Sequence, residues 1–313
     1  MTEEHHSQPH EHSPPPAQWT QPWELLLPIE STGICSGISA VAFNNKIHAF
    51  FVVDNIPGHL GLSYLVLGNN AENKLVVEKQ EYLDARYLTR HRPAVTVHEG
   101  RLFCFYTGVD KTVHYHVFSG SSWTHGEQVP GVLTEHAPSV FSTNGKLHLA
   151  VQGLYNGEFY HKIFENFEWE NTINTPGISF KGSPSLGGNG SLLYVALTGV
   201  DDSVVLFSFH SGSWQFLYTS PNYKVQGSPT IYFGRNLLMC ASVNARDQRV
   251  VTEVLGMAWP DPAHPGGIQH LGVTLGKYLS EPCLIEYGEQ LYLIGRRPCN
   301  DVGISLYKPQ VIG

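Results

Sequence analysis

Short runs of apolar and aromatic residues alternate with polar turns along almost the whole chain. The runs are about five to eight residues long, rich in β-branched and aromatic side chains, and bounded by Gly, Asn or Asp, a pattern typical of β-strands. The spacing of three to four residues that marks an amphipathic helix does not persist over any long window. The pattern therefore predicts an all-β protein.

The strands belong to a unit that recurs six times. In five units a proline precedes a short apolar run, at separations of 45, 46, 45 and 53 residues, and these prolines are Pro93, Pro138, Pro184, Pro229 and Pro282. The remaining unit has Ser39 at the equivalent position. In four units a tryptophan follows the proline after 30 or 31 residues and opens a fourth run: Trp123, Trp169, Trp214 and Trp259. Four antiparallel strands in about 45 residues, repeated, are typical of a β-propeller blade.

The two ends of the chain together supply the four strands of the last blade. The sixth unit stops after its third run, whereas the segment that starts at Trp23 supplies one extra strand. Trp23 precedes Ser39 by 16 residues, close to the 15 residues between Trp123 and Pro138. Closing the last blade in this way leaves no free edge strand. We expect a single six-bladed β-propeller over residues 19–313, four antiparallel strands per blade, after a disordered His/Pro-rich tail over residues 1–18.

Composition and charge exclude several classes of protein. The 313 residues are 42% apolar and 15% charged, unlike a coiled coil or a disordered chain. No apolar run approaches the roughly 18 residues that span a bilayer, and a net charge of −8 without a Lys/Arg cluster argues against nucleic-acid binding. The five cysteines form no CxxC pair, and the N-terminus has no apolar signal region. We expect neither metal nor cofactor, and a cytoplasmic protein or one exported without a signal peptide.

Residues that vary where the backbone repeats are the candidates for function. Those just before each recurring proline enter the innermost strand, so they should surround one mouth of the central channel, and loops of this kind commonly carry function. The predicted ligand-binding residues are Arg90, His91, Arg92, Glu135, His136, Lys181, Ser183, Gln226, Ser228 and Glu281. That these residues form only a solvated rim remains an open alternative.

Three kinds of chemistry fit such a mouth. Carbohydrate binding needs aromatic faces and a few polar groups, and repeated weak sites give avidity. Glycoside hydrolysis needs two carboxylates, for which the mouth offers Glu135 and Glu281. A sialidase-like site would add arginines that grip a substrate carboxylate, and the candidates are Arg90, Arg92, Arg296 and Arg297. The third alternative is a protein-interaction propeller that binds a peptide over the same mouth.

The unit resembles the blades of lectin-type and sialidase-like β-propellers, most clearly from Ser183 to Trp214 and from His136 to Trp169. Chain length, blade count and the shared terminal blade are similar to those of the fungal fucose-binding lectins, over Trp23 to Pro309. Those lectins bind fucose between blades through an Arg, a Glu and an aromatic residue that recur in most blades. Here arginine is confined to the second, fifth and sixth units, so the resemblance implies a carbohydrate ligand and not fucose in particular.

We therefore favour a carbohydrate-binding, lectin-like propeller without catalytic activity. Its expected partners are glycans or glycoproteins, with neither nucleic acid nor membrane insertion, and an oligomer is compatible with this function. A sialidase-like glycoside hydrolase with its site at the channel mouth is the first alternative, and a protein-interaction propeller is the second.

Overall fold

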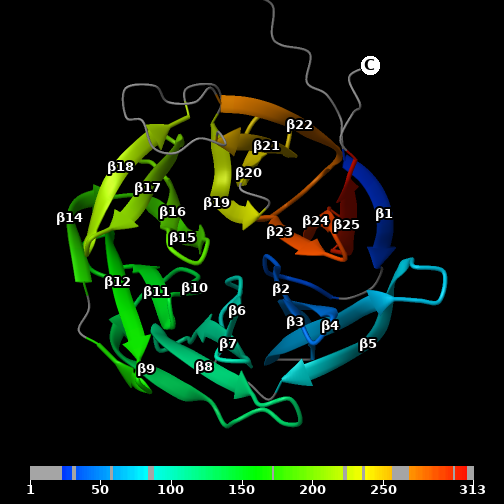
Figure 1. Cartoon of the computed structure of the whole chain (residues 1–313), viewed down its shortest axis with the longest axis horizontal. Helices are drawn as coiled ribbons and strands as arrows, with labels where there is room; N and C mark the ends of the chain where they lie inside the picture. Colours follow the sequence, from blue (N-terminus) through cyan, green and yellow to red (C-terminus); the bar gives the residue numbers. More distant parts are fainter. Residues whose placement is uncertain are drawn as a thin grey trace, which may run out of the picture.

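Every regular element of the computed structural model is a β-strand in the residues that it describes. These are residues 23–29, 33–56, 59–83, 88–170, 173–220, 224–234, 237–255, 268–298 and 300–308. The strands form six blades around a common centre (Figure 1). The predicted all-β, six-bladed propeller is confirmed, while the predicted tail over residues 1–18 lies outside the described residues.

The blades follow one another along the chain, each with its innermost strand first. Blades 1 to 3 contain β2 (Ser39–Phe43), β3 (Lys46–Ile56), β4 (His59–Asn69) and β5 (Leu75–Leu83); β6 (Ala94–His98), β7 (Arg101–Thr107), β8 (Thr112–Phe118) and β9 (Glu127–Leu133); β10 (Ser139–Thr143), β11 (Lys146–Gln152), β12 (Glu158–Glu165), β13 (Glu168–Trp169) and β14 (Ile173–Ser179). Blades 4 to 6 contain β15 (Lys181–Gly188), β16 (Leu193–Thr198), β17 (Val204–His210) and β18 (Ser213–Thr219); β19 (Val225–Gly234), β20 (Leu237–Asn244), β21 (Arg249–Leu255) and β22 (Ile268–Lys277); β23 (Cys283–Tyr287), β24 (Gln290–Arg296), β25 (Val302–Tyr307) and β1 (Trp23–Ile29).

The first hairpin of most blades is set by two residues in the left-handed region. Asn144 and Gly145 have φ of 52° and 71°, and Glu99 and Gly100 have 48° and 70°. Two-residue turns with both φ values positive twist in the same sense as the strands, and Asn and Gly adopt them readily. The second strand then lies between neighbouring blades, so its residues are buried on both faces, as in β16. This explains why the second runs are apolar without alternation.

The hydrophobic core is divided among the blade interfaces. Each of six clusters of buried side chains combines residues of two adjacent blades. The recurring tryptophans contribute to these interfaces: the Trp123 ring lies 5.8 Å from that of Phe50 in blade 1, and the Trp214 ring 5.1 Å from that of Phe159 in blade 3. In blades 2 and 4, tryptophan therefore joins the blade to the preceding one.

The outer strands differ in detail from the expected pattern. Trp123 forms an isolated bridge with Phe118, and β9 starts only at Glu127. In blade 3 the outer edge consists of two strands, β13 and β14, which both pair with β12. In blade 4, by contrast, Trp214 lies near the start of the continuous strand β18. Trp259 lies outside the described residues.

Blade 6 is closed by the N-terminal strand. β1 pairs antiparallel with β25, from Trp23 opposite Tyr307 to Ile29 opposite Val302 (Figure 1). Trp23 is only 1% exposed, and its Nε1 donates a hydrogen bond to Thr252 Oγ1 of blade 5 at 3.1 Å. The predicted closure is confirmed, and one side chain of this strand also ties blade 6 to blade 5.

Side chains at the start of the inner strands link neighbouring blades. Ser139 Oγ accepts a hydrogen bond from the Leu186 amide at 2.8 Å, and Ser185 Oγ accepts one from the Ile231 amide at 3.1 Å. The Sγ of Cys283 accepts one from Ala40 N at 3.2 Å. An inner strand has no strand on its channel side, so its amides would otherwise be left without partners.

Replacing Ser139 by alanine should lower the free energy of unfolding by about 1–2 kcal/mol, because the Leu186 amide then loses its acceptor in a buried position. Urea unfolding measures the loss. The matched control is Ser122→Ala on an exposed turn, which should change stability by less than about 0.5 kcal/mol. Equal effects of the two substitutions would contradict the link between the inner strands.

Candidate functional site

The segments that precede the recurring prolines meet at one end of the channel, around a cavity of about 170 Å³. We call this the mouth cavity, and its lining residues are Cys35, Ser36, Gly37, Arg90, His91, Arg92, Ala137, Ser183, Ser280, Glu281 and Arg296. Five of the ten predicted site residues are among them: Arg90, His91, Arg92, Ser183 and Glu281. The structure therefore brings together residues of blades 1, 2, 3, 4 and 6.

Three arginines line the mouth cavity, each with different partners. Arg90 is exposed and forms an ion pair with Asp54. Arg296 donates from Nη1 to the carbonyl oxygen of Cys35 at 3.2 Å and from Nη2 to Asn300 Oδ1 at 2.7 Å. Both guanidinium groups keep further N–H donors for a ligand. Arg297, the fourth candidate in the sequence, is not among the lining residues and lies 3.9 Å from the Asp301 carboxylate.

Arg92 crosses the channel. It precedes the inner strand of blade 2, yet its Nη1 donates a hydrogen bond to Thr230 Oγ1 of blade 5 at 3.4 Å. Its side chain is 7% exposed. Arg92 thus forms the floor of the mouth cavity.

Glu281 lies between two glycines that leave room for its side chain. A Cβ added at Gly37 would stand 2.9 Å from Glu281 Oε2 and 3.2 Å from Arg92 Cβ. A Cβ at Gly227 would stand 3.2 Å from Glu281 Oε1, and Gly227 has a φ of +75°. A side chain at either position would crowd Glu281, and one at Gly37 would also crowd Arg92, so the two glycines leave room for these side chains at the mouth.

Two histidines lie beside this acid. The rings of His91 and His136 are 5.9 Å apart. Burial is the main cause that lowers the pKa of both; the nearby His136 lowers the pKa of His91 further, and Glu281 opposes this shift. Both rings are therefore mainly neutral at pH 7, and a neutral imidazole both donates and accepts hydrogen bonds.

The other predicted site residues do not line the mouth cavity. The Glu135 carboxylate is exposed and lies 2.5 Å from the ammonium group of Lys111, which lowers the pKa of Glu135. Lys181 similarly pairs with Asp202 at 2.6 Å. Gln226 is exposed. The two acids named for hydrolysis are thus not brought together on the cavity wall, where Glu281 is the single carboxylate among the described residues.

The two predicted serines bond to neighbouring blades. Ser183 Oγ accepts from the Ala137 amide at 3.0 Å, and Ser228 Oγ accepts from the Ser183 amide at 2.9 Å. These contacts hold blades 3, 4 and 5 together. A serine before the proline therefore has a structural role at these positions.

Arg296 lines the mouth cavity but lies outside the segments that precede the prolines, and the sequence named it only as a candidate arginine of a sialidase-like site. It ends the second strand of blade 6, where blades 2 and 4 have Thr107 and Thr198. Both threonines donate to a carbonyl of the next blade, those of His136 and Gly227. A charged residue among threonines at this position is the signal that marks it. Gly37 and Ser280 stand two residues before the recurring position in the first and sixth units, so the repeat already places them at the mouth, and Ser36 directly precedes Gly37.

In the part of the chain that the structure describes, no three His, Cys, Asp or Glu side chains form a group that could hold a metal ion. Nor does any helix in that part have the length and apolarity needed to cross a membrane.

No protein-family model matches the sequence, and no curated protein matches it. Solved structures with a similar fold include lectins and sialidases. A triple-arginine mutant of AofleA from Arthrobotrys oligospora matches with a TM-score of 0.68 at 9% identity, over 91% of this chain and 87% of that one. The Aleuria aurantia lectin, a six-bladed β-propeller with fucose recognition, matches at 0.56 and 10%, over 89% and 96%.

Trypanosoma rangeli sialidase in complex with sialic acid matches with a TM-score of 0.60 at 13% identity. The match covers 94% of this chain but only 58% of the sialidase. At these identities the likeness shows the fold alone. The chain therefore shares its architecture with lectin and sialidase propellers.

Proposed function

We propose that the protein binds carbohydrate at the mouth cavity without hydrolysing it. The observation that carries the proposal is the grouping of two arginine forks, a carboxylate and a neutral imidazole around one cavity: Arg90, Arg296, Glu281 and His91. Arginine and carboxylate side chains supply fixed donors and acceptors for adjacent sugar hydroxyls, while an imidazole supplies both. Among the described lining residues His91 is the one aromatic ring, so this site would hold a sugar through polar groups rather than through a Trp or Tyr face. The ligand would be a glycan or a glycoprotein, and the lectin-like fold supports this class.

Binding is favoured over hydrolysis by the distribution of carboxylates. Most glycosidases use two carboxyl groups that flank the scissile bond. Glu281 stands on the cavity wall, whereas Glu135 is exposed and engaged by Lys111. Hydrolysis by a sialidase-like enzyme remains the alternative that the arginines suggest, since an arginine fork also suits a sugar carboxylate.

The test is a glycan array that contains neutral and acidic sugars, followed by calorimetry on the glycan that binds best. Arg296→Ala should weaken binding about tenfold or more, because hydrogen bonds from a charged group contribute roughly 1.5–3 kcal/mol. The matched control is Arg101→Ala at the start of β7, which is absent from the cavity lining and should leave the affinity unchanged.

Three results would contradict the proposal. Turnover of aryl glycosides that Glu281→Gln abolishes would assign a hydrolase. An array without any bound glycan would favour a peptide partner at the mouth. Glycan binding that neither Arg296→Ala nor Arg90→Ala changes would place the ligand outside the mouth cavity.

A further inference from the structure

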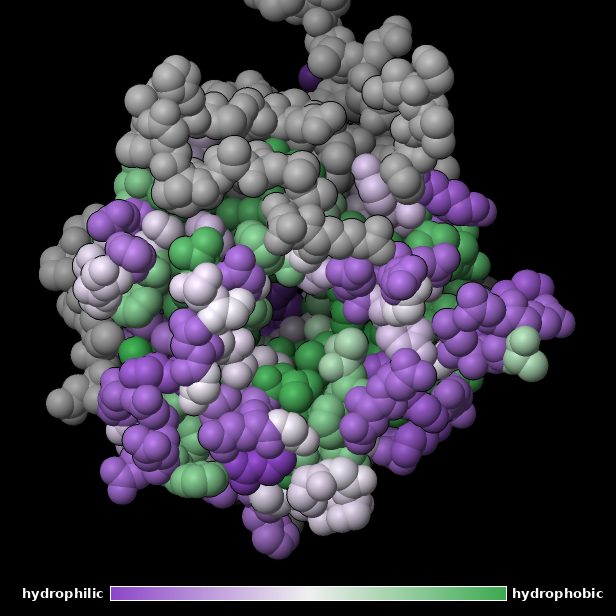
Figure 2. Space-filling view, viewed as in Figure 1, coloured by the Kyte–Doolittle hydropathy of each residue, from purple (hydrophilic) through white to green (hydrophobic). Residues whose placement is uncertain are grey.

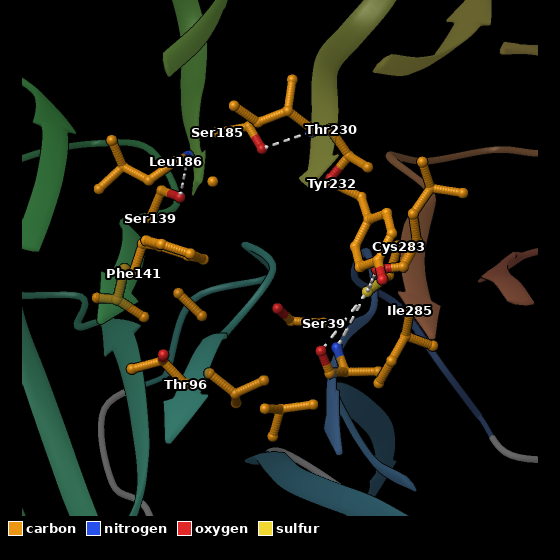
Figure 3. A pocket seen from close by; sticks show the side chains of 18 of the residues that line it. Ser39, Thr96, Ser139, Phe141, Ser185, Leu186, Thr230, Tyr232, Cys283 and Ile285 are labelled. Atoms are coloured by element: carbon orange, nitrogen blue, oxygen red, sulfur yellow. Dashed lines mark hydrogen bonds between the residues drawn. The ribbon is translucent and has the colours of Figure 1, made fainter. Parts of the chain in front are cut away.

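A second and larger cavity lies in the channel beneath the mouth. It has a volume of about 350 Å³ and is lined by the inner strands of all six blades (Figure 3). Apolar side chains form much of its wall, among them Val41, Phe141, Leu186, Ile231 and Ile285. Figure 2 shows hydrophobic residues on the wall of the hollow at the centre of the molecule and hydrophilic ones at its depth. The wall of the channel therefore combines apolar side chains with polar groups in similar amounts.

Polar groups on this wall are mostly engaged with each other. The dashed bonds in Figure 3 include those that link Ser139 to Leu186, Ser185 to the Ile231 amide, and Cys283 to Ala40. Tyr232 donates its hydroxyl to Glu286 at 2.6 Å. Because these groups already have protein partners, the apolar side chains are the surface left for the body of a ligand.

Arg92 places a positive charge at the mouth end of this channel. Among the residues that line the two cavities, it is the one that both share. It is more than nine-tenths buried, and its hydrogen bond at 3.4 Å goes to a neutral hydroxyl, that of Thr230. In the described part of the chain no carboxylate lies within ion-pairing distance of its guanidinium. Glu281 Oε2 and Arg92 Cδ stand 2.9 and 3.3 Å from the same Cβ position at Gly37, so Glu281 is a nearby carboxylate, but it forms no ion pair with Arg92. A buried guanidinium that no carboxylate contacts favours an anion.

We propose that the channel is a second binding site, adjacent to the carbohydrate site and sharing Arg92 with it, for a small carboxylic acid with an apolar body. The carboxylate pairs with Arg92 through two parallel N–H···O bonds, the geometry that a guanidinium fork favours. The aliphatic or aromatic body lies between Val41, Phe141 and Ile285. Charge and apolar surface are thus both matched by one amphipathic ligand.

The experiment is calorimetric titration of the full chain with octanoate, with octanol as the uncharged comparison. We expect octanoate to bind at one site per chain and octanol to bind at least tenfold more weakly. Arg92→Met keeps an apolar side chain of similar length and should weaken octanoate at least tenfold. Arg101→Met removes an arginine that lines neither cavity and should leave octanoate binding unchanged.

A second variant tests the channel itself without touching Arg92. Ala42 is exposed and lines the channel cavity, so Ala42→Phe should fill the space and abolish octanoate binding. Glycan binding at the mouth should survive this substitution, which separates the two sites. Absence of octanoate binding at millimolar concentration, equal binding of octanol, or octanoate binding that Ala42→Phe leaves intact would each overturn the proposal.

Discussion

Replacing Trp23 by alanine should lower the free energy of unfolding by about 4 kcal/mol, in the range found when a buried Trp or Phe is truncated. Trp23 is 1% exposed, packs 5.3 Å from the Tyr307 ring, and bonds to Thr252 of blade 5. The substitution therefore leaves a cavity between blades 5 and 6 and removes the hydrogen bond from Trp23 to Thr252. Urea unfolding followed by circular dichroism measures the change.

The control for this prediction lies on the same strand. Leu26 is 39% exposed, so Leu26→Ala should cost less than about 1 kcal/mol while removing an apolar side chain from the same strand. A similar loss in both variants would mean that β1 contributes only through its backbone pairing. A negligible loss in Trp23→Ala would mean that closure of the ring does not depend on this side chain.

Acidification should destabilise the protein through a buried histidine pair in blade 3. His148 Nδ1 lies 2.9 Å from His161 Nε2, and the rings stack at 5.1 Å. Burial is the main cause that lowers the pKa of His148 to about 4 and that of His161 to about 3. Both are therefore neutral in the folded protein at pH 7.

The sign of the change in the free energy of unfolding follows from proton uptake. Unfolded histidine has a pKa near 6.5, so below that pH the unfolded chain binds protons that the folded protein does not. The contribution of the pair is fully present above about pH 6.5 and is lost as the pH falls toward 4. Since one pKa unit corresponds to about 1.4 kcal/mol, His148 alone accounts for a loss on the order of 3 kcal/mol by pH 4.

Urea midpoints between pH 7 and 4.5 measure this loss, and His148→Phe is the matched variant. Blade 2 has Phe103 at the equivalent position, so the substitution copies a side chain that the fold already accommodates. With one of the two titrating groups removed, the dependence on pH should be clearly shallower. An unchanged slope would assign the acid sensitivity to other groups.

The fold could be predicted because its information is local and repeated. Each unit carries its own strands and turns, and the turn at Asn144-Gly145 appears in the sequence as directly as in the structure. The sixth unit ends after its third apolar run, and the segment at Trp23 supplies one extra strand. These two observations were sufficient to infer that the N-terminal strand closes the ring. What the repeat did not determine was the path of the outer strands, such as the division into β13 and β14.

The mouth was predicted in position but only partly in composition. The repeat places a residue such as Ser183 or Glu135 at the mouth, but its partner depends on the neighbouring blade. Ser183 meets an amide of blade 3, and Glu135 meets Lys111 on the adjacent hairpin. The Glu281 carboxylate instead lies next to two glycines of neighbouring blades, which leave space around it. No alignment of one unit with another contains these relations between blades.

Arg296 has a consequence for the assembled ring that extends beyond recognition. Its guanidinium donates a hydrogen bond to the Cys35 carbonyl and so connects the last blade to the first. At this seam, the interface between blades 6 and 1, a ring built from one chain has to close. A ligand bound to the same arginine would hold its side chain in place and so stabilise this hydrogen bond between blades 6 and 1. Saturation should then protect the seam against opening in addition to the mass-action stabilisation that any ligand of the native state provides, and the seam is where slower hydrogen exchange would first become visible.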